Sequence, residues 1–161
     1  MIIAPVRGDF KVTQWFGERP EVYARFKYKS GRPMKGHNGI DLSTPVNTPI
    51  YSPIDGIWEV GEDPNGYGLY IRITEEPHKD ERRQVILAHL SSIEIAGKDK
   101  VKAGELVALS GNSGFSTGPH LHWGFRRLDR GGSVINFDNG FFGYEDIFDK
   151  GWITKNEPSI Y

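Results

Sequence analysis

The sequence predicts an all-β fold, mainly an antiparallel sheet of the hairpin-sandwich type, with one or two short peripheral helices. Three observations predict it: short apolar stretches alternate with Gly, Pro and Asn, 20 of the 161 residues are glycine, and helical periodicity is scarce. With 37% hydrophobic residues, a chain of this length can bury one core. We therefore expect a single domain over residues 1–161.

Eight stretches have the composition of strands: residues 11–16, 40–42, 49–52, 56–60, 69–74, 84–90, 106–110 and 121–126. Turns are predicted at residues 63–66 and 111–114, where Pro, Asn and Gly favour chain reversal. The charged stretch 75–83 lies between two predicted strands, and we expect it to be a solvated hairpin tip.

Helix is predicted at two places only, over residues 21–28 and 143–148. Residues 128–161 are rich in Gly, Asp, Asn and aromatic residues and have no clear period. We expect this C-terminal extension to pack on the sheet.

The composition excludes several classes of function. The formal net charge of −1 gives the chain no electrostatic attraction for nucleic acid or for an anionic membrane surface. No apolar run approaches the roughly 18 residues that a membrane span needs. Cysteine is absent, which excludes disulfides, thiolate zinc sites and cysteine nucleophiles. Any metal must therefore be held by imidazole and carboxylate groups.

Histidines gather in three short segments of the sequence. His120 and His122 stand two apart on a predicted strand, so both imidazoles point to the same face. One of them can bind a metal while the other does proton chemistry beside it. His37 and Asp41 lie in the motif Gly-His-Asn-Gly-Ile-Asp-Leu, and His89 lies in Leu-Ala-His-Leu. Together these segments predict an active site.

A catalytic zinc ion is commonly held by three protein ligands. His37, Asp41 and one histidine of the 120/122 pair would supply them. The i,i+4 spacing of His37 and Asp41 would suit a helix, but the glycines between and before them disfavour one. We expect a loop there that runs into a strand at Ile40.

Seven motifs follow one another in an order that resembles a known enzyme family: residues 12–17 (VTQWFG), 36–41 (GHNGID), 49–56 (PIYSPIDG), 88–90 (AHL), 101–105 (VKAGE), 111–114 (GNSG) and 117–123 (TGPHLHW). They resemble the lysostaphin-type (LytM-type) zinc endopeptidases, which cut peptide bridges in bacterial cell walls. The resemblance is strongest over residues 10–127. Trp123 stands where this family commonly has Phe.

The resemblance implies one Zn²⁺ per chain, bound by His37, Asp41 and His122. It assigns His89 and His120 to the zinc-activated water and the transition state, and we favour His120 as the base because it neighbours His122. The implied function is a zinc metalloendopeptidase that hydrolyses amide bonds in peptidoglycan stem peptides or cross-bridges.

Three alternatives remain open at this point. A non-catalytic module of the same fold would bind peptidoglycan or activate an amidase, but such relatives have lost one or more of the five side chains. The turns at 53–56 and 101–105 also resemble the halves of biotinyl or lipoyl carrier domains. A carrier needs a lysine in a hairpin tip between these halves, typically flanked by Met, but the only methionines are Met1 and Met34, which precede both turns. A zinc hydrolase of the D-Ala-D-Ala type shares the ligand types, with a poorer match in spacing.

The partner implied is a bacterial peptidoglycan peptide, with no nucleic acid and no membrane. Residues 1–10 lack the features of a signal peptide. We therefore expect synthesis in the cytoplasm and action on the cell wall, as a monomer or within a larger lysis or phage assembly, such as a phage-encoded endolysin.

Some family members are kept latent by an upstream Asn that occupies the zinc site. Residues 1–36 contain no Asn, which predicts an open zinc site and activity as translated.

Substrate contacts are expected around the Gly-rich turns 66–68 and 111–118, where a peptide backbone can approach closely. Six aromatic residues are candidates for the groove walls, although packing within the protein is favoured for each: Tyr67, Phe115, Trp123, Phe141, Phe142 and Tyr144.

Overall fold

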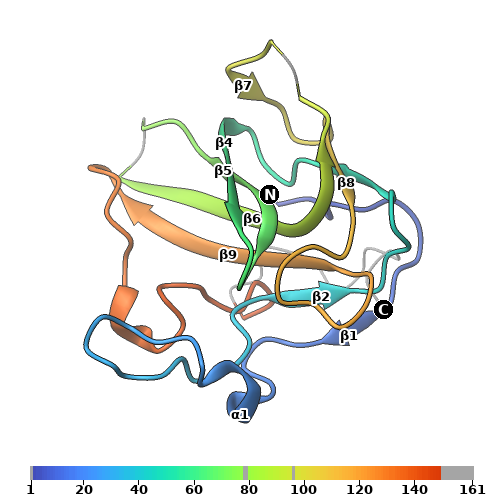
Figure 1. The fold of residues 1–161 in the computed structure, drawn as a ribbon. Coiled ribbons are helices and arrows are strands. Elements are labelled where there is room, and N and C mark those ends of the chain that lie inside the picture. The colour runs from blue at the N-terminus through green and yellow to red at the C-terminus, as the bar shows by residue number, and fades with distance from the viewer. Residues whose placement is uncertain (1, 78–79, 96, 150–161) are drawn as a thin grey trace.

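The predicted all-β fold is confirmed by a computed structural model, which describes residues 2–77, 80–95 and 97–149. Its strands are β1 (Val12–Gln14), β2 (Ile40–Leu42), β3 (Pro49–Tyr51), β4 (Gly56–Asp63), β5 (Gly68–Thr74), β6 (Glu81–Ile93), β7 (Lys100–Val101), β8 (Leu106–Ser110) and β9 (Leu121–Asp129). They pair antiparallel in the order β1-β2-β9-β6-β5-β4-β7, with β8 beside both β6 and β3 (Figure 1). All eight predicted strands are present, and β7 is an additional short one.

The long, curved strand β6 organises the sheet (Figure 1). It pairs with β5 along one edge. On the other edge its partner changes from β9, whose first residues pair up to Ala88, to β8, whose last residue Ser110 pairs with Leu90. His89 lies at this change of partner. Its φ of 60° is left-handed, and the register against β5 shifts between Leu69 and Ile71, which marks a β-bulge.

Hydrophobic side chains of β6 alternate between the two faces of the sheet. Val85 and Leu87 join the main core, whereas Ile86 and Ala88 pack with Tyr144 in a second cluster. The backbone of Tyr144 forms a bridge with Arg126 of β9, so the C-terminal segment covers this second face. The remainder of the predicted extension, residues 150–161, lies outside the described residues.

The two helix predictions are only partly right. Helix α1 (Pro20–Tyr23) is a single turn, because the chain after it forms a hairpin in which Lys27 pairs with Pro33. Residues 143–148 are not helical: the Glu145 N–H donates to the carbonyl of Phe125, so pairing with β9 overrides the local preference. A 3₁₀ turn, η1 (Phe137–Asn139), forms instead.

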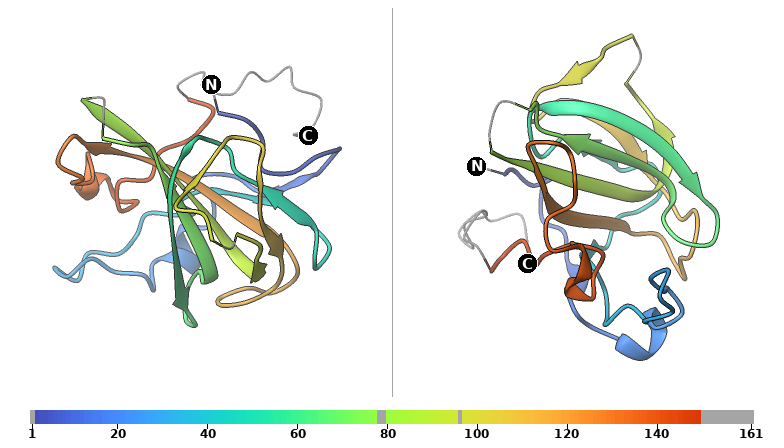
Figure 2. Two further views of the ribbon diagram at one scale, coloured as in Figure 1. Left: turned by 90° about the horizontal axis from the view of Figure 1, so that it is seen from above. Right: turned by 90° about the vertical axis from the view of Figure 1, so that its left-hand side faces the viewer.

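The hairpin after α1 is attached to the C-terminal segment. The hydroxyl of Tyr28 donates to the carbonyl of Phe137 at 2.7 Å and accepts from the N–H groups of Gly140 and Phe142. The rings of Tyr28 and Phe142 lie 4.4 Å apart. The two segments therefore lie side by side at one end of the molecule (Figure 2). Among the described residues, no helix has the length and apolarity to cross a membrane.

The base of the charged 75–83 hairpin is not solvated, contrary to the prediction. Glu75 is buried, and its carboxylate accepts hydrogen bonds from the backbone N–H and the Nε of Arg83 at 2.9 and 2.8 Å. Burying the carboxylate is tolerated because these charge-assisted bonds replace its hydration. His78 and Lys79, within this stretch, lie outside the described residues.

Candidate metal centre

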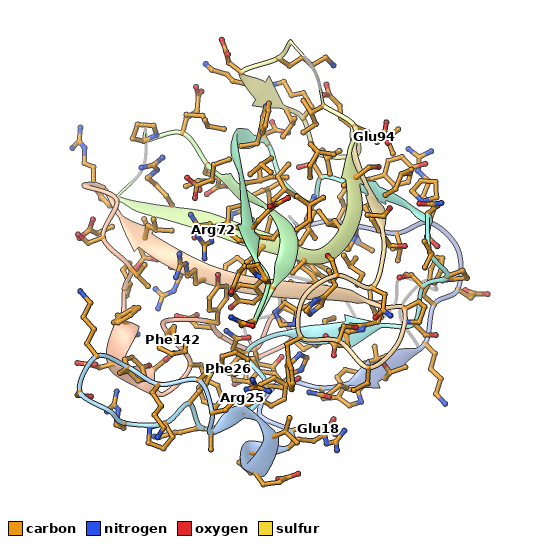
Figure 3. The ribbon with its side chains drawn as sticks, in the orientation of Figure 1. Glu18, Arg25, Phe26, Arg72, Glu94 and Phe142 are labelled. Atoms are coloured by element: carbon orange, nitrogen blue, oxygen red, sulfur yellow. The ribbon has the colours of Figure 1, made fainter. Side chains whose placement is uncertain are left out.

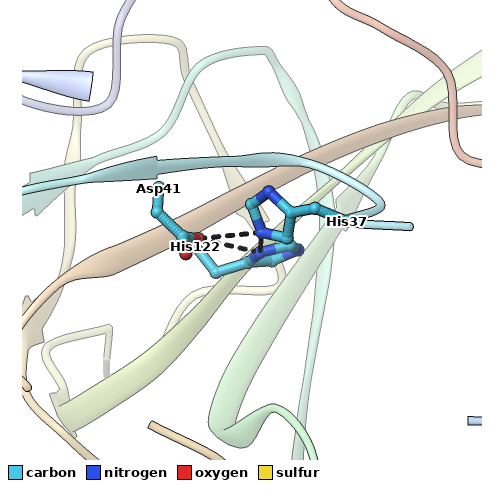
Figure 4. Close-up of side chains that lie close together, drawn as sticks. All are labelled: His37, Asp41 and His122. Atoms are coloured by element: carbon cyan, nitrogen blue, oxygen red, sulfur yellow. Dashed lines mark hydrogen bonds and ion pairs between the residues drawn. The ribbon is translucent and has the colours of Figure 1, made fainter. Parts of the chain in front are cut away.

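Three potential ligand atoms converge where β2 meets β9. The register pairs Asp41 of β2 with His122 of β9, and His37 enters from the loop that leads into β2. His37 Nε2 lies 3.0 Å from Asp41 Oδ1 and 2.9 Å from His122 Nδ1, and His122 Nδ1 lies 3.2 Å from the same carboxylate oxygen (Figure 4). All three side chains are buried.

The orientation of His37 is fixed by contacts on its far side. Its Nδ1 lies 3.1 Å from the carbonyl oxygen of Trp15, to which an Nδ1–H donates, and this tautomer leaves a lone pair on Nε2. Two backbone hydrogen bonds hold the loop: Gly17 N–H to the carbonyl of His37, and His37 N–H to the carbonyl of Glu18. The Phe16-Gly17 turn of the first motif therefore positions His37, which belongs to the second motif.

Electrostatics keep this group in the state that binds cations. Burial alone would raise the pKa of the Asp41 carboxyl, but its hydrogen bonds and electrostatic interactions with His122 and His37 hold it well below its usual range. Burial lowers the pKa of His122, and the hydrogen bond to Asp41 only partly offsets this. An ionised carboxylate thus faces an imidazole that favours its neutral form.

The donor set fits zinc. Two imidazole nitrogens and one carboxylate oxygen are zinc ligands, and ligand atoms around a tetrahedral ion are separated by about 3.3 Å. The observed separations of 2.9–3.2 Å are close to this value. Without a cation, the atoms must share protons, which metal binding would release. His122 Nε2 is buried and has no hydrogen-bond partner among the described residues, whereas Nδ1 of the same ring points into the group.

His89 reaches the site through the bulge in β6. Its Nδ1–H donates to the carbonyl of Ser113 at 2.7 Å, and this tautomer leaves Nε2 unprotonated. Burial, together with the charges of His122 and His120, lowers its pKa to about 3. His89 is therefore a neutral hydrogen-bond acceptor at neutral pH.

His120 lies immediately before β9, and its backbone pairs with Gly111. Its Nδ1 lies 2.8 Å from the carbonyl of Gly118, and its Nε2 lies 3.5 Å from Asp41 Oδ2. The rings of His120 and His89 are 4.6 Å apart. All five residues singled out in the sequence thus line or border one site.

A cavity of about 410 Å³ opens onto Asp41, His89, His120 and His122. Of the six aromatic candidates, Tyr67, Phe115 and Phe142 line it. Trp123 and Tyr144 are core residues, each 1% exposed, and Phe141 packs on Phe16. These last three are therefore not walls of the cavity.

Sequence reasoning missed Tyr23, which also lines the cavity. Its ring lies 5.1 Å from that of His37, and its hydroxyl accepts a 2.6 Å hydrogen bond from Gln14 Nε2. Among the described residues none accepts the Tyr23 proton. Burial, followed by the charge of Asp41, raises the pKa of Tyr23 to about 12. Tyr23 therefore keeps a proton that it can donate into the cavity. No local signal marks it, since its predicted helix suggested only a peripheral element.

Comparisons with known proteins agree with this geometry. The model of peptidase family M23 matches residues 35–136, which include all five residues above. The glycyl-glycine endopeptidase ALE-1 of Staphylococcus capitis is 34% identical over 115 residues, 71% of this chain and 30% of ALE-1. The peptidoglycan DD-endopeptidase ShyA of Vibrio cholerae is 38% identical over 87 residues, 54% of this chain and 19% of ShyA. The chain thus spans less than a third of the length of these curated relatives.

Solved structures of M23 and zinc peptidases are also similar to this chain. A variant of the catalytic domain of the prophage-encoded M23 protein EnpA from Enterococcus faecalis aligns with a TM-score of 0.60 and 33% identity, over 84% of this chain and 95% of that domain. A zinc containing peptidase from Vibrio cholerae aligns with a TM-score of 0.58 and 31% identity, over 83% of this chain and 39% of the other.

Proposed function

The chain belongs to peptidase family M23, and we propose that it is a zinc-dependent endopeptidase that hydrolyses amide bonds in peptidoglycan stem peptides or cross-bridges. The observation that carries this proposal is the buried convergence of His37 Nε2, Asp41 Oδ1 and His122 Nδ1 beside two further histidines. Family membership sets aside the carrier-domain and D-Ala-D-Ala-type alternatives.

His37, Asp41 and His122 would hold the zinc ion. Bound zinc supplies a Lewis acid that polarises a carbonyl group and lowers the pKa of water from 15.7 towards about 7. The protein's contribution is to keep the three ligand atoms together in a buried pocket and to present the peptide from the cavity side.

His120 is the proposed general base. Its Nδ1 is occupied by the carbonyl of Gly118, so Nε2 is available to accept a proton from the attacking water. As the new C–O bond forms and the amide C–N bond breaks, the same nitrogen delivers that proton to the leaving amine. His89, neutral and with its Nε2 unprotonated, accepts a hydrogen bond that orients the water or the leaving group.

Tyr23 supplies the proposed donor for the developing oxyanion. The hydrogen bond from Gln14 orients its hydroxyl, and the raised pKa keeps it protonated. A fixed donor of this kind stabilises negative charge in the transition state without having to reorganise.

Two relatives of known activity support the proposed substrate class. ALE-1 is a glycyl-glycine endopeptidase and ShyA a peptidoglycan DD-endopeptidase, so both glycine bridges and direct cross-links are candidate bonds. EnpA is prophage-encoded, which supports the further proposal that this chain acts on the cell wall within a phage particle or lysis system. Action as a monomer is the alternative proposal.

Zinc content and amine release test the proposed function together. Purified protein should contain about one zinc per chain and release new amino groups from peptidoglycan with glycine bridges, with direct cross-links, or with both. Chelator should abolish the release, and His120→Ala should lower it by roughly two to four orders of magnitude. Zinc without release from any peptidoglycan would favour the non-catalytic binding or amidase-activating module, and absence of zinc would refute the proposal.

A further inference from the structure

The two walls of the cavity touch each other through three side chains, which we call the clasp: Arg25, Phe26 and Phe115. The ring of Phe26 meets that of Phe115 edge-on, with centroids 5.7 Å apart and an interplanar angle of 72°. The guanidinium of Arg25 lies 4.5 Å from the centre of the Phe115 ring and 5.6 Å from that of Phe26. Arg25 and Phe26 are labelled in Figure 3, beside α1.

Within the described part of the chain, the recorded side-chain contacts of Arg25 are with these two rings. Arg25 is exposed, and among the described residues no acidic group pairs with its guanidinium. An arginine that lies over an aromatic face gains a cation–π contact while remaining hydrated. The clasp is thus a contact between side-chain tips that can open without exposing the core.

The wall that carries Arg25 and Phe26 is held firmly at its base. The N–H of Met34 donates to the carbonyl of Phe26 at 2.8 Å, which closes the hairpin behind the clasp. The same hairpin is attached to the C-terminal segment by the three hydrogen bonds of the Tyr28 hydroxyl. Removing a tip side chain leaves all of these bonds in place.

The opposite wall is equally well anchored. The N–H of Phe115 donates to the carbonyl of Gly66 at 2.8 Å, and the hydroxyl of Ser113 donates to the carbonyl of Leu90. The two backbones touch closely, because a Cβ on Gly114 would clash with the backbone nitrogen of Gly68. The position of Phe115 is therefore determined by the β4–β5 turn and not by the clasp.

A peptide that reached the metal centre through this cavity would pass the clasp. Phe26 and Phe115 line the same cavity as His89 and His120. Its volume of about 410 Å³ suits one small ligand, and hence a short stretch of peptide. A linear stem peptide has a free end and can stop at the clasp, whereas a cross-linked peptide continues on both sides of the scissile bond.

We propose that the clasp determines substrate specificity by closing the space between the two walls of the cavity. Linear stem peptides bind while the clasp is closed. Cross-linked peptides bind only after Arg25 and Phe26 separate from Phe115. The proposal rests on the proposed function for the class of substrate. Binding to a state that is only partly populated is weakened in proportion to that population. The closed clasp therefore lowers the affinity for cross-linked peptides selectively.

The test is a comparison of binding constants for a fluorescent linear stem peptide and for the same peptide cross-linked to a second one. It is made with zinc-loaded protein carrying His120→Ala, to slow hydrolysis. Adding Phe115→Ala or Arg25→Ala should strengthen binding of the cross-linked peptide by roughly three- to tenfold and leave the linear peptide unchanged. Arg7→Ala, which removes a guanidinium 3.8 Å from the ring of Tyr51 and away from the cavity, is the matched control and should change neither.

A second variant holds the clasp closed. The chain contains no cysteine, so Arg25→Cys combined with Phe115→Cys provides the only two thiols for a short bifunctional thiol reagent. The joined protein should bind the linear peptide and lose the cross-linked one. Equal changes for both peptides, no change for either, or no binding of either peptide would overturn the proposal.

Hydrolysis by the unsubstituted protein separates the two proposals. Cleavage of either peptide without a selective effect of the clasp variants would refute the clasp and retain the proposed function. A selective effect on binding without cleavage would retain the clasp and refute the endopeptidase.

Discussion

The α-carbon of Gly39 lies against the imidazole of His122. A Cβ at Gly39 would lie 2.7 Å from Cε1 of His122 and 2.6 Å from the carbonyl oxygen of Trp123, distances that real Cβ atoms do not show. The glycine between His37 and Asp41 therefore leaves room for a ligand ring contributed by a strand more than 80 residues later. Backbone and imidazole are both held by the β2–β9 pairing, so neither can move aside freely.

Gly39→Ala should weaken zinc binding by roughly 10–100-fold, the usual effect of disturbing the residues that orient a ligand. Competition with a chromogenic chelator measures it. Gly118→Ala is the control, because a Cβ there meets nothing within 4 Å. Equal zinc affinities for the two variants would contradict the packing argument.

Removing a ligand should remove the metal. Asp41→Ala or His122→Ala should reduce zinc from about one per chain to near zero by elemental analysis. Since zinc binds the folded state only, chelator should lower the melting temperature of the unsubstituted protein and leave that of the ligand variants unchanged. A ligand variant that retained stoichiometric zinc would exclude that residue from the site.

His120→Ala and His89→Ala should separate catalysis from metal binding. We expect each to lower kcat by roughly two to four orders of magnitude with zinc retained, the span usual for general acid–base groups. Amine release, with zinc measured on the same samples, checks this. Near-normal turnover of His89→Ala would remove His89 from the mechanism.

Tyr23→Phe removes only the hydroxyl that Gln14 orients. The loss of one oxyanion donor should lower kcat by roughly one to three orders of magnitude, with a smaller change in KM. Steady-state kinetics on the preferred peptide tests this. Tyr51→Phe, in β3 and away from the cavity, serves as the control. Identical kinetics for the two variants would reduce Tyr23 to a packing role.

The Glu75–Arg83 pair should matter for stability and not for activity. Glu75→Gln weakens the charge-assisted bonds to a carboxylate that is 9% exposed, and we expect a loss of about 1–3 kcal/mol in the free energy of unfolding. Glu59→Gln is the control, since Glu59 is 66% exposed, lies 3.9 Å from Arg72 and should contribute at most about 0.5 kcal/mol. Urea unfolding compares them. Equal losses would show that burial does not strengthen the Glu75 pair.

Much of the fold could be predicted because strand signals are local. The alternation of apolar residues and the turn residues between them identified eight of the strands. Helix was harder to predict: residues 143–148 have a helical composition, but the N–H of Glu145 finds an acceptor on β9. Similarly, the charge of the 75–83 stretch suggested full solvation, while the burial of Glu75 depends on its pairing with Arg83 across the hairpin.

The sequence by itself determined the chemistry available: imidazoles and carboxylates without thiols, a His-x-His pair, and glycine beside His37. These are properties of residue type and of spacing within a few positions. Only the tertiary structure decided how these residues meet, because strand pairing and the bulge in β6 bring together residues that are distant in sequence. The left-handed backbone of His89, the hydroxyl of Tyr23 above His37, and the contact of Arg25 and Phe26 with Phe115 all depend on segments distant in sequence. Long-range packing supplies their geometry, and no local pattern of residues encodes it.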